Sequence, residues 1–95
     1  MAADDDPSFR IPDQVLNREV DGQMVLLDLD SEQYFGLDEV GAVMVHHLTT
    51  EPFDTAIGSL EAAFDVDPAR LRADLDDLVA TLLDAGLLVR VGGAG

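Results

Sequence analysis

Hydrophobic and polar residues suggest extended structure in the first half of the chain and recur at helical spacing in the second half. Two apolar runs, "VLNREV" and "QMVLLDL", flank the dipeptide Asp21-Gly22, which supplies the positive φ angles of a two-residue hairpin turn. Strands are therefore predicted over residues 14–20 and 23–29. Residues 30–32 (Asp-Ser-Glu) predict a second turn, and residues 33–37 ("QYFGL") a third, short strand.

Three helices are predicted after the third strand. Asp38 is the expected N-cap of the first helix, and "TTEPFD" ends that helix. The second helix covers residues 55–64. Asp67 and Pro68 give the third helix its start, and Gly86 ends it as a left-handed cap, before "LLVRV" adds a short extended segment. The predicted apolar stripes are Val40, Val43, Met44, His47 and Leu48 in the first helix, Ile57, Leu60 and Phe64 in the second, and Leu71, Leu75, Leu78 and Leu82 in the third.

This order predicts an α+β fold, a three-stranded antiparallel sheet followed by three helices. Two helices joined by a short turn before a longer one are typical of a helix-turn-helix, here with the hairpin as a wing. The 95 residues have room for one core. We predict a flexible acidic arm over residues 1–13, one winged helix-turn-helix domain over residues 14–90 and a flexible tail over residues 91–95.

The net charge of −15, from 20 acidic and 5 basic residues, changes what a winged helix would bind. Nucleic acids and anionic membranes both require clustered Lys and Arg, which this chain lacks, so neither is an expected partner. A neutral or basic protein or peptide is favoured, although an acidic surface also serves solubility alone. Cysteine is absent, and neither a signal peptide nor a membrane span is visible, so a cytoplasmic location is expected.

Alternating carboxylates at Asp28, Asp30 and Glu32, with Glu39 further on, resemble a calcium loop. Such a loop needs glycine at its sixth position, where this chain has Gln33, and a helix before it, where a strand is predicted. We therefore interpret these residues as turn formers and as acids at a helix N-terminus, and expect no metal ion.

No catalytic constellation emerges from the remaining polar residues. His46 and His47 are adjacent on a helix and point about 100° apart, so they cannot grip one ion together. Ser59 in "IGSLE" resembles the attachment serine of acyl carrier proteins, but it falls inside a helical stripe and the chain begins with strands. We expect neither an enzyme nor a cofactor.

The third strand and the third helix together suggest a peptide site. An extended peptide can add to an exposed sheet edge, with nearby pockets giving specificity. On the third helix Val79 and Leu83 widen the apolar face, and Arg72 and Asp76 flank the same side. The alternative is that Val79 and Leu83 pack under the sheet.

Two stretches, "VLLDLDSEQYFGLDEVGAVMVHHL" and "VDPARLRADLDDLVATLLDAGLLV", resemble the PqqD-like family across about residues 14–90. Asp38 replaces the usual Asn, and Val45 stands where Trp is common. The resemblance implies a RiPP recognition element, a winged helix-turn-helix domain that binds the leader of a ribosomally made precursor peptide. The leader would pair with the third strand and lie against the third helix, which implies a site of Gln33, Tyr34, Phe35 and Gly36 with Leu75, Val79 and Leu83.

The resemblance also implies a second partner, a maturation enzyme that receives the leader. In lasso-peptide biosynthesis this is a cysteine protease, and in assembly of the cofactor PQQ it is a radical-SAM enzyme. The "YFGLDEVG" junction is closer to the lasso group. A winged-helix transcriptional regulator remains the alternative from another class.

Overall fold

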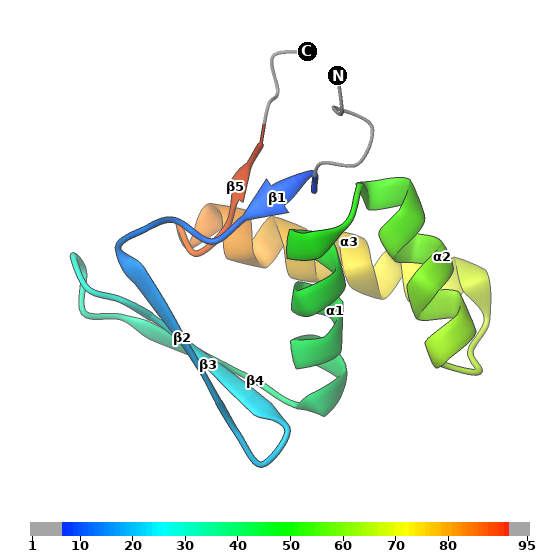
Figure 1. Cartoon of the computed structure of the whole chain (residues 1–95), viewed down its shortest axis with the longest axis horizontal. Coiled ribbons are helices and arrows are strands. Elements are labelled where there is room, and N and C mark those ends of the chain that lie inside the picture. The colour runs from blue at the N-terminus through cyan, green and yellow to red at the C-terminus, as the bar shows by residue number, and fades with distance from the viewer. Residues whose placement is uncertain (1–6, 92–95) are drawn as a thin grey trace.

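An antiparallel sheet and three helices make up most of the computed structural model, which describes residues 7–91. The strands are β2 (Val15–Val20), β3 (Gln23–Asp28) and β4 (Tyr34–Leu37), in the order β2-β3-β4. The helices that follow are α1 (Glu39–Thr50), α2 (Phe53–Ala63) and α3 (Pro68–Asp84), as Figure 1 shows. The predicted α+β class, three strands followed by three helices in a winged helix-turn-helix arrangement, is confirmed.

The hairpin between β2 and β3 has the predicted two-residue turn. Val20 pairs with Gln23, which leaves Asp21 and Gly22 as the only residues between the strands. Their φ angles are +54° and +82°. Two successive positive φ values give a turn whose twist matches that of the flanking strands, so this dipeptide fixes the register of the hairpin.

The helix ends follow from short-range chemistry in the sequence. Asp38 Oδ1 accepts a hydrogen bond from the backbone N–H of Gly41 at 2.8 Å and so caps α1. Asp67 caps α3, with Pro68 in the first turn. Gly86, with φ of +76°, follows the last turn of α3 in the left-handed conformation. All three predicted end signals are confirmed.

The apolar stripe predicted for α1 is only partly right. Met44 and Leu48 are buried as expected, but so are Ala42 and Val45, whereas Val40 is 45% exposed. The helix contacts β1, β3 and β4 on one side and α2 on another, so it is buried over a wider arc than a single stripe describes. Val40 lies in the first turn of α1 and lines the groove described below.

A second, two-stranded sheet joins the two ends of the described chain. β1 (Phe9–Arg10) pairs antiparallel with β5 (Val89–Arg90), which confirms the extended segment after Gly86. Phe9 is buried in the core, and its ring meets that of Phe53 edge to face, with centroids 6.0 Å apart. Packing against α2 thus gives Phe9 a structural role, and the prediction that it belongs to a flexible arm is wrong.

The predicted arm over residues 1–6 and the tail over residues 92–95 lie outside the described residues. None of the helices within residues 7–91 combines the length and the apolar composition needed to cross a bilayer.

Candidate functional site: the free edge of β4 and its groove

The backbone of β4 offers unpaired hydrogen-bonding groups at one edge of the sheet. Asp28 N–H donates to the carbonyl of Gln33 at 2.8 Å, which marks this pair as a hydrogen-bonded one. Antiparallel ladders alternate such pairs with open ones, so the register makes Leu26–Phe35 the next bonded pair. The N–H and C=O groups of Tyr34 and Gly36 therefore point away from β3, toward the free edge. The backbone carbonyl of Gln33 points toward β3 instead.

Side chains of β4 alternate between the two faces of the sheet. Phe35 and Leu37 face the helices and pack into or against the core, whereas Tyr34 projects from the opposite face and is 75% exposed. A strand added at this edge would also place alternate side chains on the two faces. Half of them would then point toward the helices.

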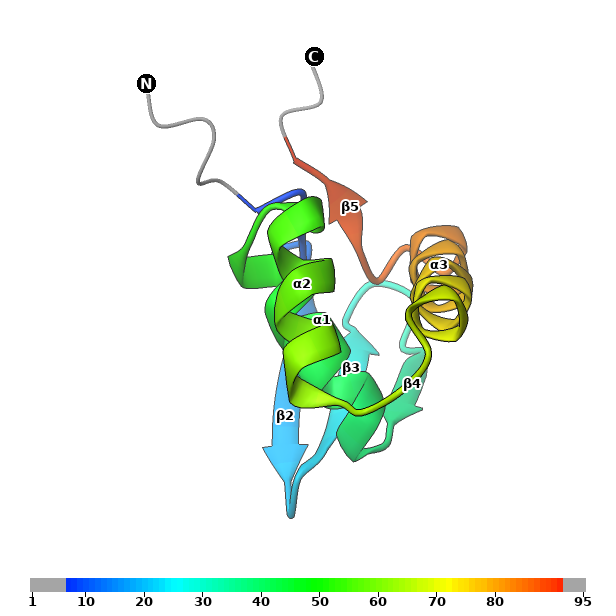
Figure 2. The ribbon, with the colours of Figure 1, turned by 90° about the vertical axis from the view of Figure 1, so that its right-hand side faces the viewer.

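A groove runs along the inner side of the β4 edge. Figure 2 shows β4, rather than β2, on the side of the sheet nearest α3. The groove has a volume of about 490 Å³ and an apolar floor between the two elements. It is lined by Phe35, Gly36, Leu37 and Asp38 from β4 and the α1 cap, by Val40, Gly41 and Met44 from α1, and by Asp74 and Leu78 from α3.

Two of the residues predicted to wall this groove lie in the core instead. Val79 is only 7% exposed, and Leu75 is fully buried. Both belong to the same core cluster as Leu26 and Leu82, so Val79 packs in the core and not in the wall of the groove. The helix turns a neighbouring stripe toward the groove, and its contact there is Leu78.

Arg72, Asp76 and Leu83 do not line the groove either. Arg72 lies over the ring of Phe53, 5.2 Å from its centroid, and its Nε is 3.4 Å from Asp76 Oδ1. This pair therefore occupies the side of α3 that faces the start of α2. Leu83 is partly buried against the core. Of the nine predicted residues, Phe35 and Gly36 lie in the groove and Tyr34 on its edge strand.

Seven of the nine lining residues were not among the predicted site residues: Leu37, Asp38, Val40, Gly41, Met44, Asp74 and Leu78. Val40 and Leu78 were assigned to core stripes because apolar periodicity does not distinguish a side chain under a sheet from one beside it. Met44 is a core residue, as predicted, and also lines the groove. Asp74 carried no signal, being one of 20 acidic residues. The position of Val40, an apolar residue in the first turn of the helix that Asp38 caps, was the one signal that could have indicated the groove.

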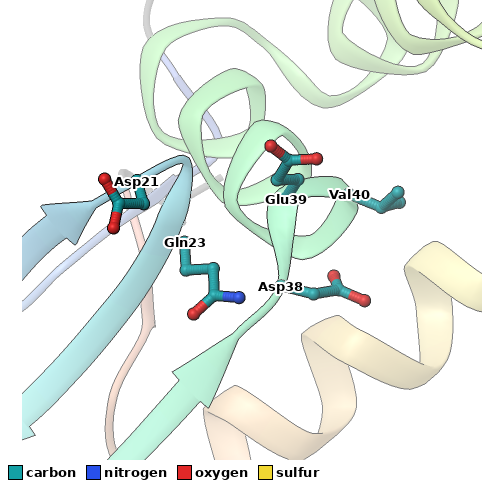
Figure 3. Close-up of a pocket in the computed structure, with 5 residues that line it drawn as sticks. All are labelled: Asp21, Gln23, Asp38, Glu39 and Val40. Atoms are coloured by element: carbon teal, nitrogen blue, oxygen red, sulfur yellow. The ribbon is translucent and has the colours of Figure 1, made fainter.

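The groove carries negative charge at its ends and sides. Asp74 is loosely paired with Arg70, whose Nε lies 3.9 Å from Asp74 Oδ2, and both side chains are largely exposed. Where β4 enters α1, a shallow acidic pocket of about 260 Å³ opens toward the hairpin turn. Figure 3 shows the side chains that line it, Asp21, Gln23, Asp38, Glu39 and Val40. A ligand with basic groups near an apolar segment would suit this field.

The loop with alternating carboxylates is a turn, as predicted. Asp28 Oδ1 accepts hydrogen bonds from the backbone N–H groups of Asp30 at 2.9 Å and Ser31 at 3.4 Å. Glu32 adopts a φ of +62° and donates its N–H to the Asp28 carbonyl. These contacts explain Asp28 as a local turn former. Within residues 7–91 no three His, Asp or Glu side chains gather as metal ligands would.

A polar network elsewhere joins α1 to α2. Ser59 Oγ donates to Glu51 Oε1 at 2.9 Å, and His47 Nδ1 lies 3.2 Å from Glu51 Oε2. The hydrogen bond from Ser59 lowers the pKa of Glu51. A carboxylate with a lowered pKa is a weak base, so it does not activate the serine as a nucleophile. The network serves packing between the helices.

Comparison with known proteins bears directly on this groove. A family described as coenzyme PQQ synthesis protein D (PqqD) matches residues 23–88, from the first residue of β3 to beyond α3. The chain belongs to the PqqD family. The match includes β4 and α3, the elements on either side of the groove, and it confirms the predicted resemblance. A search of curated proteins finds no match.

Two solved structures share the fold of this PqqD-family chain. One is TbiB1 in complex with the TbiA(beta) leader peptide, 30% identical, with a TM-score of 0.77 over 90% of this chain and 99% of that one. The other is lasso peptide synthetase B1 complexed with the leader peptide, 25% identical, with a TM-score of 0.78 over 86% and 98% of the two chains. Both of these proteins are recorded with a leader peptide.

Proposed function

We propose that this chain binds the leader of a ribosomally made precursor peptide by β-strand addition and presents it to a separate maturation enzyme. The leader pairs with the backbone of Tyr34 and Gly36 and lays alternate side chains in the groove between β4 and α3. The chain itself performs no catalysis. The maturation enzyme is most simply the leader protease of a lasso-peptide pathway.

The observation that carries this proposal is a free sheet edge beside an apolar groove. Strand addition needs unpaired N–H and C=O groups in register, which Tyr34 and Gly36 offer. Specificity needs apolar contacts beside that edge, and Phe35, Met44 and Leu78 provide them. The PqqD family and the two leader-bound relatives support the same reading.

The comparisons favour two pathways. Similarity to a lasso peptide synthetase supports a cysteine protease as the receiving enzyme. The family description, a PQQ synthesis protein, supports the second candidate, a radical-SAM enzyme that modifies a PQQ precursor. The precursor and enzyme encoded beside this chain distinguish the two pathways directly.

Binding is tested with a fluorescein-labelled synthetic leader, taken from the precursor encoded beside this chain, in an anisotropy titration. The expected Kd is micromolar or tighter, which corresponds to about −8 kcal/mol. Leu78→Asp places a charge in the apolar groove and should weaken binding at least tenfold, about 1.4 kcal/mol. Circular dichroism should show that this variant stays folded, because Leu78 is only partly buried.

Ala80→Asp is the matched control. Ala80 is exposed on the same helix and lies outside the groove, so the variant adds the same charge without touching the site. It should bind the leader within twofold of the wild type. Absence of leader binding by the wild type would refute the proposal, and a shifted band with random duplex DNA at moderate salt would support the regulator instead.

A further inference from the structure

The face of the sheet that points away from the helices is unusually apolar. We define the outer face as Leu16, Arg18 and Val20 of β2, Gln23, Val25 and Leu27 of β3, Leu29 just after β3, and Tyr34 and Gly36 of β4. Strand register places Leu16, Leu27 and Tyr34 side by side in one row across all three strands. Arg18 and Val25 form the next row, with Gly36 beside them.

These side chains are open to solvent. Leu16, Val20, Val25, Leu29 and Tyr34 are between 39% and 75% exposed and account for five of the seven large apolar residues that the described chain exposes. Ordinary two-layer packing leaves the outer side of a sheet polar, with apolar residues only on the core side. A contiguous apolar patch of this kind marks a surface that another molecule covers.

Gly36 adds a recess to the outer face. A Cβ built at Gly36 would meet nothing within 4 Å, and a hollow of about 240 Å³ lies over Gly36, Val25 and Gln23. The hollow lies on the side of the second row that faces Gln23 and Asp38, and it gives a partner side chain a place to insert there. The outer face therefore combines apolar side chains with a recess.

Charge decides which class of partner fits. A second copy would bring together two chains of net charge −15, and an anionic membrane would be repelled in the same way. Acidic side chains also flank the face, with Asp21 at one end of the sheet and Asp30 and Glu32 at the other. A protein with an apolar centre and a basic rim complements this surface.

Arg18 adds a further requirement for the chemistry of the partner protein. It stands on the outer face, and none of the ion pairs within residues 7–91 includes it. Its guanidinium group can therefore meet a carboxylate of the partner at the β2 side of the contact. Charge-assisted pairs of this kind fix orientation and register between proteins.

We propose that the outer face is the docking surface for the maturation enzyme, an inference that rests on the proposed leader-binding function. β4 belongs to both surfaces: its edge and inner side chains form the groove, and Tyr34 projects from the outer face. Leader and enzyme can then occupy the chain at once without competing for the same side chains. The enzyme is held directly beside the strand that carries its substrate.

The test measures enzyme binding and leader binding separately. The purified maturation enzyme encoded beside this chain is titrated against immobilised wild type, Leu16→Glu and Arg18→Glu by biolayer interferometry, without leader. Each variant should lose at least tenfold in affinity for the enzyme. Anisotropy with the labelled leader should remain within twofold of the wild type for both variants, because neither residue touches the groove.

Asn17→Glu is the matched control. Asn17 lies between the two mutated positions in β2, is exposed and points to the other side of the sheet, so it should leave enzyme affinity unchanged. Unchanged enzyme binding by both outer-face variants would overturn the proposal. So would a wild-type dimer in analytical ultracentrifugation that Leu16→Glu converts to monomer, because a second copy would then cover the face. Failure of the wild type to bind leader, with enzyme binding intact, would contradict the proposed function and not this docking surface.

Discussion

Val79→Asp tests the assignment of α3 residues to core and groove. Val79 is 7% exposed and packs in the cluster that contains Leu75 and Leu82, so the new carboxylate would have no partner. An uncompensated buried charge costs about 3–5 kcal/mol, against a total stability of about 5–15 kcal/mol for a domain of ordinary size. Each kcal/mol corresponds to roughly 4–8 °C in Tm for a domain of this size. The expected fall in Tm is therefore at least about 12 °C.

The assay is thermal unfolding followed by circular dichroism at 222 nm, with two companion variants. Val79→Ala removes two methyl-sized groups, which costs about 1.6 kcal/mol from transfer alone. It should lower the Tm by less than Val79→Asp does. Leu78→Asp, one residue earlier but facing the groove, should lower leader affinity with a much smaller change in Tm. If Val79→Asp melts within about 3 °C of the wild type and still loses leader binding, Val79 belongs to the groove and the core assignment is wrong.

Further predictions concern the cap of α1, the hairpin and acid stability. Asp38→Ala removes the cap of α1 and should cost about 1 kcal/mol in urea unfolding, whereas an unchanged midpoint would show that the cap is dispensable. Gly22→Ala strains a position with φ of +82° and crowds Glu39 Oε2 at 2.7 Å, so the Tm should fall; a rise would contradict this geometry. Glu51, whose folded pKa is lowered by Ser59, stabilises the fold above its ordinary pKa of 4.5, and this contribution is lost as pH falls through the lowered value. Ser59→Ala should therefore lower stability more at pH 7 than at pH 3, and an equal loss at both pH values would count against the linkage.

The sequence predicted those elements that local chemistry determines. Asp21-Gly22 set the hairpin, Asp38 and Asp67 set the starts of two helices, and Gly86 set the end of the last. Each of these residues acts within a few positions of itself, through a φ angle or a hydrogen bond to a nearby amide. These turns and helix ends can therefore be predicted without knowledge of any tertiary contact.

The composition of the groove could not be read in the same way. Leu78 and Val79 are neighbours on α3, and only the rotation of that helix against β4 decides which one is buried. That rotation is a tertiary property, set by how α3 packs into the shared core. Phe9 shows the same limit, because its burial depends on Phe53, 44 positions further along the chain, and on a ribbon formed by the two ends of the chain. The free N–H groups of β4 likewise required the strand register.

Amide hydrogen exchange of the leader complex, followed residue by residue by NMR, shows directly whether the leader pairs with the edge of β4. Strand addition at β4 predicts that exchange at Tyr34 and Gly36 slows at least about tenfold when leader is added, whereas Phe35, already paired with Leu26, changes little. The sheet has a second free edge on β2. There Leu29 N–H donates to the Gln14 carbonyl, which marks Gln14 and Leu29 as a hydrogen-bonded pair. Because bonded and open pairs alternate along the ladder, the backbone N–H and C=O groups of Asn17 and Glu19 point outward. New protection at Asn17 and Glu19 in place of Tyr34 and Gly36, or binding with no new protection at either edge, would contradict the account.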